Sequence, residues 1–179
     1  MRVVSGRLGG RTLVAPRGGH TRPTSDRVRE AVFSILGPID GLRVLDLFAG
    51  SGAMAIESLS RGAAEATLVD SSAASVAAIR RNLQQLDLEA EVTQQKAETF
   101  LERARRSGRQ YDLVFVDPPY RQAGSLSQRL TAALAPVLSK GARVVAESDR
   151  REPLELGLAP LDRRRYGDTL ILIFHGPTR

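Results

Sequence analysis

Between Leu42 and residue 150, short apolar runs alternate with longer segments that have helical periodicity. Runs such as 44–48 and 113–116 are almost continuously apolar, which is typical of strands that helices cover on both faces. The expected strands are 43–48, 66–70, 91–94, 113–117 and 142–147, and the expected helices lie near 53–61, 72–86, 97–107 and 125–139. This alternation predicts an α/β fold built on a parallel sheet.

The two ends of the chain depart from this alternation. Strand-like segments at 161–166 and 169–174 flank a tight turn, which predicts an antiparallel hairpin and therefore a mixed sheet. At the N-terminus, short strands at 2–5 and 11–15 around a glycine-containing turn predict a small β-hairpin. A helix follows, with capping side chains at 24–26. We expect a single domain over 1–179, with residues 1–23 as a basic appendage and 24–179 as the core.

Positive charge is concentrated in the N-terminal segment. The formal net charge of the chain is +6, and residues 1–30 carry seven arginines against two acidic residues. Arginine favoured over lysine could reflect base composition, but that would not concentrate the charge at one end. Arginine forks match phosphate geometry, so this segment is expected to bind nucleic acid. The residues expected to do so are Arg2, Arg7, Arg11 and Arg22. A structural role for the arginines at 22, 27 and 29, paired with neighbouring carboxylates, is the alternative.

Several classes of site are excluded or disfavoured by composition. The chain has no cysteine, which excludes disulfides and thiolate metal sites. Its two histidines, His20 and His175, have no visible partner, so no bound metal is expected. There is neither a secretory signal nor an apolar run of about 20 residues that could span a bilayer. We expect a cytoplasmic protein that acts as a monomer.

A glycine turn follows the first buried strand in the segment 46–52, Asp-Leu-Phe-Ala-Gly-Ser-Gly. Gly50 and Gly52 let the backbone bend sharply and approach a ligand closely. In an open α/β sheet, ligands bind beyond the carboxyl ends of the strands, over this first turn. The second strand ends in Asp70, where a carboxylate can accept hydrogen bonds from both ribose hydroxyls of an adenosine.

The nature of the ligand depends on Asp46. The turn lacks the third glycine of a dinucleotide site, because Ala55 stands there, and it lacks the Gly-Lys-Ser/Thr of a phosphate loop. A carboxylate at position 46 would repel a pyrophosphate and attract the α-ammonium group of S-adenosylmethionine. The alternative is that Asp46 only caps a helix or bonds within the turn.

A second motif, Asp117-Pro118-Pro119-Tyr120, comes directly after the fourth strand. The two prolines fix the backbone and remove two N–H donors, so the loop presents carbonyl groups. An exocyclic base amine could donate its N–H groups to Asp117 and to the Pro118 carbonyl, while Tyr120 stacks on the base. Such a base would first have to leave its stack. The motif therefore indicates methylation of a base amine, without a metal or a covalent intermediate.

Together with the segment 21–30, Thr-Arg-Pro-Thr-Ser-Asp-Arg-Val-Arg-Glu, these motifs resemble the RsmD family over essentially the whole chain. Its members are bacterial methyltransferases that act on guanine N2 in small-subunit (16S) ribosomal RNA. The resemblance implies a Rossmann-like class I methyltransferase fold with seven strands, and catalysis by Asp117, Pro118 and Tyr120. The implied cofactor contacts are Asp46, Phe48, Ala49, Gly50, Ser51, Gly52, Asp70, Ser71 and Ala97. The acidic residue that many methyltransferases carry before the adenine-contacting position is missing near Ala97.

Other functions stay open at this point. A DNA adenine-N6 methyltransferase could use the same Asp-Pro-Pro-Tyr chemistry, but the roughly 40 residues before the core are short for a target-recognition segment. A protein glutamine methyltransferase usually carries Asn where this chain has Asp117. A non-catalytic RNA-binding module on the same fold is a third alternative. We expect the partner to be ribosomal RNA, in an assembling or assembled small subunit.

Overall fold

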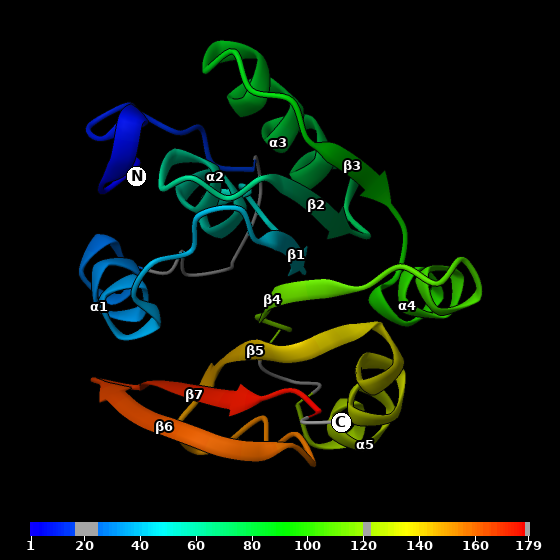
Figure 1. Ribbon diagram of the computed structural model, residues 1–179. Coiled ribbons are helices and arrows are strands. Elements are labelled where there is room, and N and C mark those ends of the chain that lie inside the picture. The colour runs from blue at the N-terminus through cyan, green and yellow to red at the C-terminus, as the bar shows by residue number, and fades with distance from the viewer. Residues whose placement is uncertain (17–24, 120–122, 178–179) are drawn as a thin grey trace.

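The computed structural model describes residues 1–16, 25–119 and 123–177. Its centre is a seven-stranded sheet with the order β3-β2-β1-β4-β5-β7-β6 (Figure 1). The strands are β1 (Arg43–Leu47), β2 (Glu65–Asp70), β3 (Glu91–Gln94), β4 (Tyr111–Val116), β5 (Leu138–Asp149), β6 (Ala159–Tyr166) and β7 (Thr169–His175). Strands β1 to β5 pair in parallel, and β7 is antiparallel to both β5 and β6. The expected mixed sheet with a C-terminal hairpin is confirmed.

Among the described residues, five α-helices cover the two faces of the sheet. They are α1 (Asp26–Leu36), α2 (Ala53–Ser60), α3 (Ala73–Gln85), α4 (Ala97–Arg106) and α5 (Ala123–Leu134). Apolar residues of α1, α2 and α3 share one core with one face of the sheet, whereas those of α4 and α5 share a second core with the other face (Figure 1). Because both faces are covered, β1 and β4 are buried almost throughout, as their continuous apolar sequence predicts.

The fourth crossover differs from the expected helix over 125–139. Helix α5 ends at Leu134, a short 3₁₀ turn covers Ala135–Val137, and β5 begins directly after it. Pro136 accounts for this end, because proline removes a helical N–H and its ring clashes with the preceding turn. Strand β5 then shifts its register against β4 before the regular pairing that starts at Arg143.

The N-terminal hairpin is less regular than expected. Its two arms pair through backbone hydrogen bonds around one antiparallel bridge, between Arg2 and Thr12, and a 3₁₀ turn (Gly6–Leu8) joins them. Val3 and Leu13 are buried in the core formed with α1 to α3. This segment is therefore packed against the sheet's helices, and this packing replaces the long ladder that regular strands would form.

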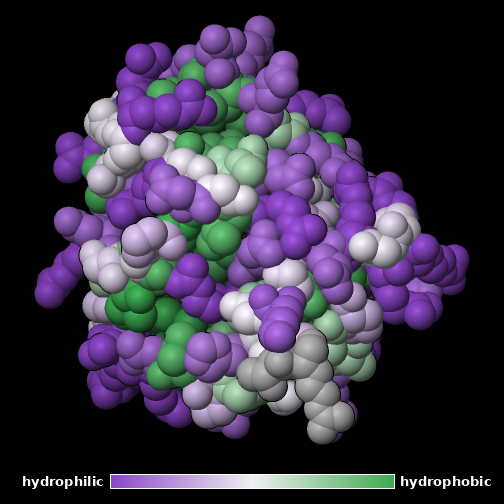
Figure 2. Space-filling model, in the orientation of Figure 1, coloured by the Kyte–Doolittle hydropathy of each residue, from purple (hydrophilic) through white to green (hydrophobic). Residues whose placement is uncertain are grey.

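Strands β1 to β5 run in the same direction, so the sheet has a carboxyl edge, where these five strands end, and an amino edge, where they begin. Polar side chains cover most of the face shown in Figure 2. In the part of the chain that the structure describes, Leu161 is the one large hydrophobic residue that is exposed. None of the helices in these described ranges has the length and the apolar character that a membrane span requires.

Candidate active site

The turn between β1 and α2 has an unusual backbone. Phe48, Gly50 and Gly52 have positive φ angles of 61°, 57° and 78°. A Cβ atom on Gly52 would lie 2.8 Å from Cδ2 of Leu68, so glycine is required there by both conformation and space. Phe48 has no such freedom, and a non-glycine residue in this region is strained by about 1–3 kcal/mol. Strain of this kind is common where a backbone is shaped for a ligand.

Asp46 is the next-to-last residue of β1, just before this turn, and is almost fully buried. Its Oδ2 atom accepts a hydrogen bond of 3.1 Å from the backbone N–H of Ala55, in the first turn of α2. The helix-capping role that the sequence left open is therefore present. Burial raises the pKa of Asp46 to about 8, the hydrogen bond from Ala55 opposes this, and the nearby charge of Asp70 adds to it. A buried carboxyl with so high a pKa is a favourable place for a cation.

Asp70, at the end of β2, connects the glycine turn to the start of α3. Its Oδ2 atom accepts from the N–H of Gly50 at 2.9 Å, and its Oδ1 atom accepts from the N–H of Ser72 at 2.8 Å. Each carboxylate oxygen has a second lone pair, so these bonds leave capacity for a ligand hydroxyl. Ser71, between them, is exposed.

The end of β3 lies beside Asp70. The N–H of Gln95 donates to the Asp70 carbonyl at 3.1 Å, and Ala97, the first residue of α4, is buried. The Nε2 atom of Gln95 is buried and has no hydrogen-bond partner among the described residues. A buried amide donor of this kind favours a ligand with a ring nitrogen or a carbonyl that can accept from it.

Asp117 comes directly after β4, at the carboxyl edge of the sheet, and is half-buried. Because Val116 pairs with Ala146, the next residue on each strand places Asp117 level with Glu147 of β5. The pKa of Asp117 is raised well above its ordinary value, first by desolvation and then by the charges of Glu147 and Asp46. Pro118 is buried. The structure thus brings three carboxyl groups together from β1, the end of β4, and β5.

Tyr120 and Arg22 lie outside the described residues, so their expected roles stay predictions. The other expected RNA-binding arginines, Arg2, Arg7 and Arg11, are exposed. Arg2 forms an ion pair of 3.3 Å with Asp26. RNA contact by these arginines also stays a prediction.

Arg29 has the structural role that was the alternative for this part of the chain. Its side chain is fully buried, donates to Asp26 at 2.9 Å and donates to the Arg2 carbonyl. It therefore fastens the start of the chain to α1.

The N-terminal segment is also connected to the glycine turn. Asn82 of α3 accepts from the N–H of Val14 at 2.7 Å and donates to the Val14 carbonyl at 3.0 Å. The same amide nitrogen of Asn82 donates to the Ser51 carbonyl at 2.9 Å. On α2, the buried Glu57 accepts from the N–H groups of Val4 and Ser5 at 2.6 and 2.9 Å. The segment that precedes the core therefore helps to hold Ser51 in place.

No cluster of three or more His, Cys, Asp or Glu side chains that could hold a metal ion occurs in residues 1–16, 25–119 and 123–177. His175 is exposed at the end of β7, and His20 lies outside these ranges. What the carboxyl edge offers is a strained glycine turn, buried carboxyl groups and an unpartnered amide. This combination suits an organic ligand that carries both an ammonium group and hydroxyls.

Comparison with known proteins agrees with this geometry. A family model described as conserved hypothetical protein 95 matches residues 1–175. Bacillus subtilis YlbH, named as a candidate rRNA methyltransferase, is 38% identical over 97% of this chain and 98% of its own length. Ribosomal RNA small subunit methyltransferase D of Escherichia coli K12 is 42% identical over 68% of this chain and 61% of its own.

The chain belongs to the RsmD family. Among solved structures, E. coli YhhF, described as a candidate methyltransferase, is 32% identical with a TM-score of 0.85, covering 100% of this chain and 99% of that one. The T. thermophilus 16S rRNA N2 G1207 methyltransferase RsmC, in complex with AdoMet and guanosine, is 25% identical with a TM-score of 0.73, covering 95% of this chain and 46% of that one. These similarities confirm the Rossmann-like class I methyltransferase fold.

The structure places three residues at this site that sequence reasoning did not single out, Glu147, Asn82 and Gln95. Glu147 ends a buried run next to the Asp117 strand, and this position was the available signal. Asn82 is a polar residue on the buried side of a predicted helix, which is a weaker signal. Gln95 has no distinguishing pattern, because nothing in the sequence says that its amide is buried.

Proposed function

We propose that this protein transfers the methyl group of S-adenosylmethionine to the exocyclic N2 amine of a guanine in small-subunit ribosomal RNA. The observation that carries the proposal is the convergence of Asp46, the 48–52 turn, Asp70 and Asp117 at one edge of the sheet. RsmD-family relatives named as ribosomal RNA small subunit methyltransferases, and a structural neighbour named as a 16S rRNA N2 methyltransferase, support the choice of substrate.

The residues present fit S-adenosylmethionine. Asp46 is buried with a raised pKa, so it would be stabilised by an ammonium group and would repel a pyrophosphate. Asp70 retains capacity to accept from ribose hydroxyls, and the buried Gln95 amide lies where β3 ends, beside Ala97. When bound, S-adenosylmethionine supplies a methyl group activated by a positively charged sulfur.

The loop after β4 would hold the base. The guanine amine can donate its two N–H groups to Asp117 and to the Pro118 carbonyl, which favours a tetrahedral nitrogen with an available lone pair. The amine must lose a proton as its bond to the methyl carbon forms. Asp117 can accept this proton, since desolvation and the neighbouring charges raise its pKa and make its carboxylate a stronger base than an ordinary one.

The cellular setting is part of the same proposal. A single domain over 1–179 acting as a monomer would reach its target base on an assembling or assembled small subunit, in the cytoplasm. Ribosomal proteins would help to present a base that must leave its stack. This view predicts faster methylation of particles than of naked transcript.

The proposal is tested with small ribosomal subunits purified from a strain that lacks this gene. Incubation with labelled S-adenosylmethionine and the protein should introduce label, and mass mapping of nucleosides should identify it as N2-methylguanosine. Detection of N6-methyladenosine instead would support an enzyme that methylates adenine at N6. Cofactor binding by calorimetry without transfer to any RNA would support a non-catalytic RNA-binding module.

A further inference from the structure

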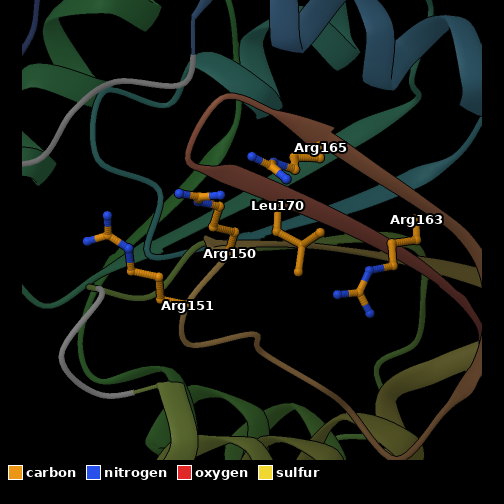
Figure 3. Close-up of a pocket in the computed structure, with 5 residues that line it drawn as sticks. All are labelled: Arg150, Arg151, Arg163, Arg165 and Leu170. Atoms are coloured by element: carbon orange, nitrogen blue, oxygen red, sulfur yellow. The ribbon is translucent and has the colours of Figure 1, made fainter.

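A strongly basic cavity lies outside the cofactor and base sites. It has a volume of about 480 Å³. Its lining residues are Arg150, Arg151, Arg163, Arg165 and Leu170. Figure 3 shows two of the arginines on β6 and two on the segment after β5, with Leu170 of β7 between them. We call these four arginines the 150/165 cluster.

The positive charge of the 150/165 cluster is only partly balanced. Arg150 forms an ion pair of 3.1 Å with Asp168. Arg165 donates to the Gly167 carbonyl, which orients its guanidinium group without neutralising it. Within the described ranges, Arg151, Arg163 and Arg165 form no ion pair with an acidic side chain. The cavity therefore holds four guanidinium groups and an excess of positive charge, which favours an anionic partner.

Side chains alternate between the two faces of β6, so the two arginines of the cluster lie on the face opposite to an ion pair between Asp162 and Arg164. Arg163 and Arg165 are two residues apart, so their side chains leave the same face of the strand. On the opposite face, Arg164 is paired with Asp162 at 3.1 Å. One face of the strand is thus internally balanced, whereas the other adds its charge to that of Arg150 and Arg151.

The cluster lies at the carboxyl edge, on the side of Asp117. Asp117 is level with Glu147 of β5, and Glu147 pairs with Ile171 of β7. Arg165 of β6 pairs with Leu170, the neighbour of Ile171. Asp117 and Arg165 are therefore separated by three interstrand spacings, on the order of 14 Å. Nucleotides that flank a base held at Asp117 would extend over this distance.

Charged residues on β6 could instead serve only to keep an edge strand from pairing with other chains. That role would require charge on β6 alone. Arg150 and Arg151 are not on the edge strand, and yet they line the same cavity. Their convergence with Arg163 and Arg165 indicates a binding surface.

We propose that the 150/165 cluster binds the phosphodiester backbone of the ribosomal RNA next to the target base. This inference rests on the proposed function. Guanidinium forks bind phosphate oxygens in pairs, which suits a surface that positions RNA without reading its sequence. The N-terminal arginines occupy a different part of the molecule. The turn that contains Arg7 packs against Ser60 at the end of α2, toward the amino edge.

The test compares two double variants with equal loss of charge. Arg163→Gln/Arg165→Gln removes two guanidinium groups of the cluster. The control, Arg105→Gln/Arg106→Gln, removes two exposed guanidinium groups at the end of α4, toward the amino edge, which are paired with Glu102. For the first variant we expect kcat/KM on methyl-deficient small subunits to fall by roughly tenfold at physiological salt, with little change in kcat. The slope of the logarithm of RNA affinity against the logarithm of salt concentration should also decrease in magnitude, by the equivalent of about one to two phosphate contacts. The control should retain wild-type values.

Calorimetry with S-adenosylmethionine and a thermal melt of each variant show that binding of the cofactor and folding are intact. If the wild-type protein methylates small subunits and both variants do so equally well, the 150/165 cluster does not bind RNA, and the proposed function stands. If the wild-type protein transfers no methyl group to small subunits, the result contradicts the proposed function itself and not only the role of the 150/165 cluster. Reduced binding to the particle with unchanged binding to naked ribosomal RNA would also overturn the inference, since the partner would then be a ribosomal protein.

Discussion

The two edges of the parallel sheet use carboxyl groups in opposite ways. At the amino edge, a cavity of about 530 Å³ is lined by Arg43 and Tyr111 among others. Arg43 donates to both oxygens of Asp112, at 2.9 and 3.0 Å, and this bonding lowers the pKa of Asp112. At the carboxyl edge, Asp46 and Asp117 form no ion pair with any described residue, and their pKa values are raised.

This contrast separates structural from functional acidic residues. Asp112 already has its cation in the folded chain, so it contributes to stability and has no need of a ligand. Asp46 and Asp117 are desolvated without a cation, which costs free energy that a bound ligand can recover. The amino-edge cavity is larger than the arginine cavity, but both of its arginines are paired, Arg43 with Asp112 and Arg109 with Glu91. Unsatisfied charge is therefore a better guide to the active site than cavity size.

The largest effect is expected at the base-binding loop. Asp117→Asn keeps the shape of the side chain but removes its ability to accept the amine proton, so kcat should fall by about 100- to 1000-fold. Single-turnover methylation of small subunits measures this. The affinity for S-adenosylmethionine should change little. An unchanged kcat would mean that Asp117, like Asp112 at the amino edge, takes no part in catalysis.

A second, smaller effect is expected on binding of the cofactor. Asp46→Asn keeps an oxygen that can accept from the Ala55 N–H, so the fold should survive. Loss of the charge should raise the Kd for S-adenosylmethionine by roughly 30- to 100-fold, because a buried charge partner is removed. Calorimetry measures this, and a melting temperature close to wild type would show that capping of α2 is retained. Unaltered affinity would mean that Asp46 is only a helix cap.

The pH dependence of cofactor binding tests whether ionised Asp46 binds the ammonium group of S-adenosylmethionine. Burial raises the pKa of Asp46 to about 8, so in the free protein this group is mostly protonated at pH 6 and half ionised near pH 8. An ammonium ligand requires the ionised form. Its affinity should therefore increase with pH, by up to about tenfold per unit below pH 8, and level off only above pH 8. Asp46→Asn should flatten this profile, and an equally steep profile in that variant would assign the titration to another group.

The smallest effect on activity is expected at the amino edge. Asp112→Asn weakens the hydrogen bonds from Arg43 and Ser139 and should cost about 1–3 kcal/mol in the free energy of unfolding. A thermal melt should show this as a decrease of about 2–12 °C. Below its melting temperature, kcat should stay close to wild type. A large loss of kcat in the folded variant would show that the amino edge contributes to catalysis.

Much of the fold could be predicted because its signals are local. The alternation of apolar strands with helices, the glycine turn after β1 and the hairpin of β6 and β7 each depend on neighbouring residues. Helix α5 ends earlier than its sequence predicts, because the surrounding residues favour a longer helix and only Pro136 ends it. The N-terminal hairpin is less regular than its sequence predicts, because its conformation depends on hydrogen bonds to Glu57 and Asn82, which lie far along the chain.

The sequence by itself determined which chemical groups the carboxyl edge would receive, because parallel strands must end together and Asp46, Asp70 and Asp117 each stand at a strand end. Only the tertiary structure decided their ionisation, since desolvation depends on everything packed around a group. It also decided that Glu147 lies level with Asp117, and that arginines from β6 and from the segment after β5 line one cavity. Strand pairing and burial join residues that are distant in sequence, and no local pattern records them.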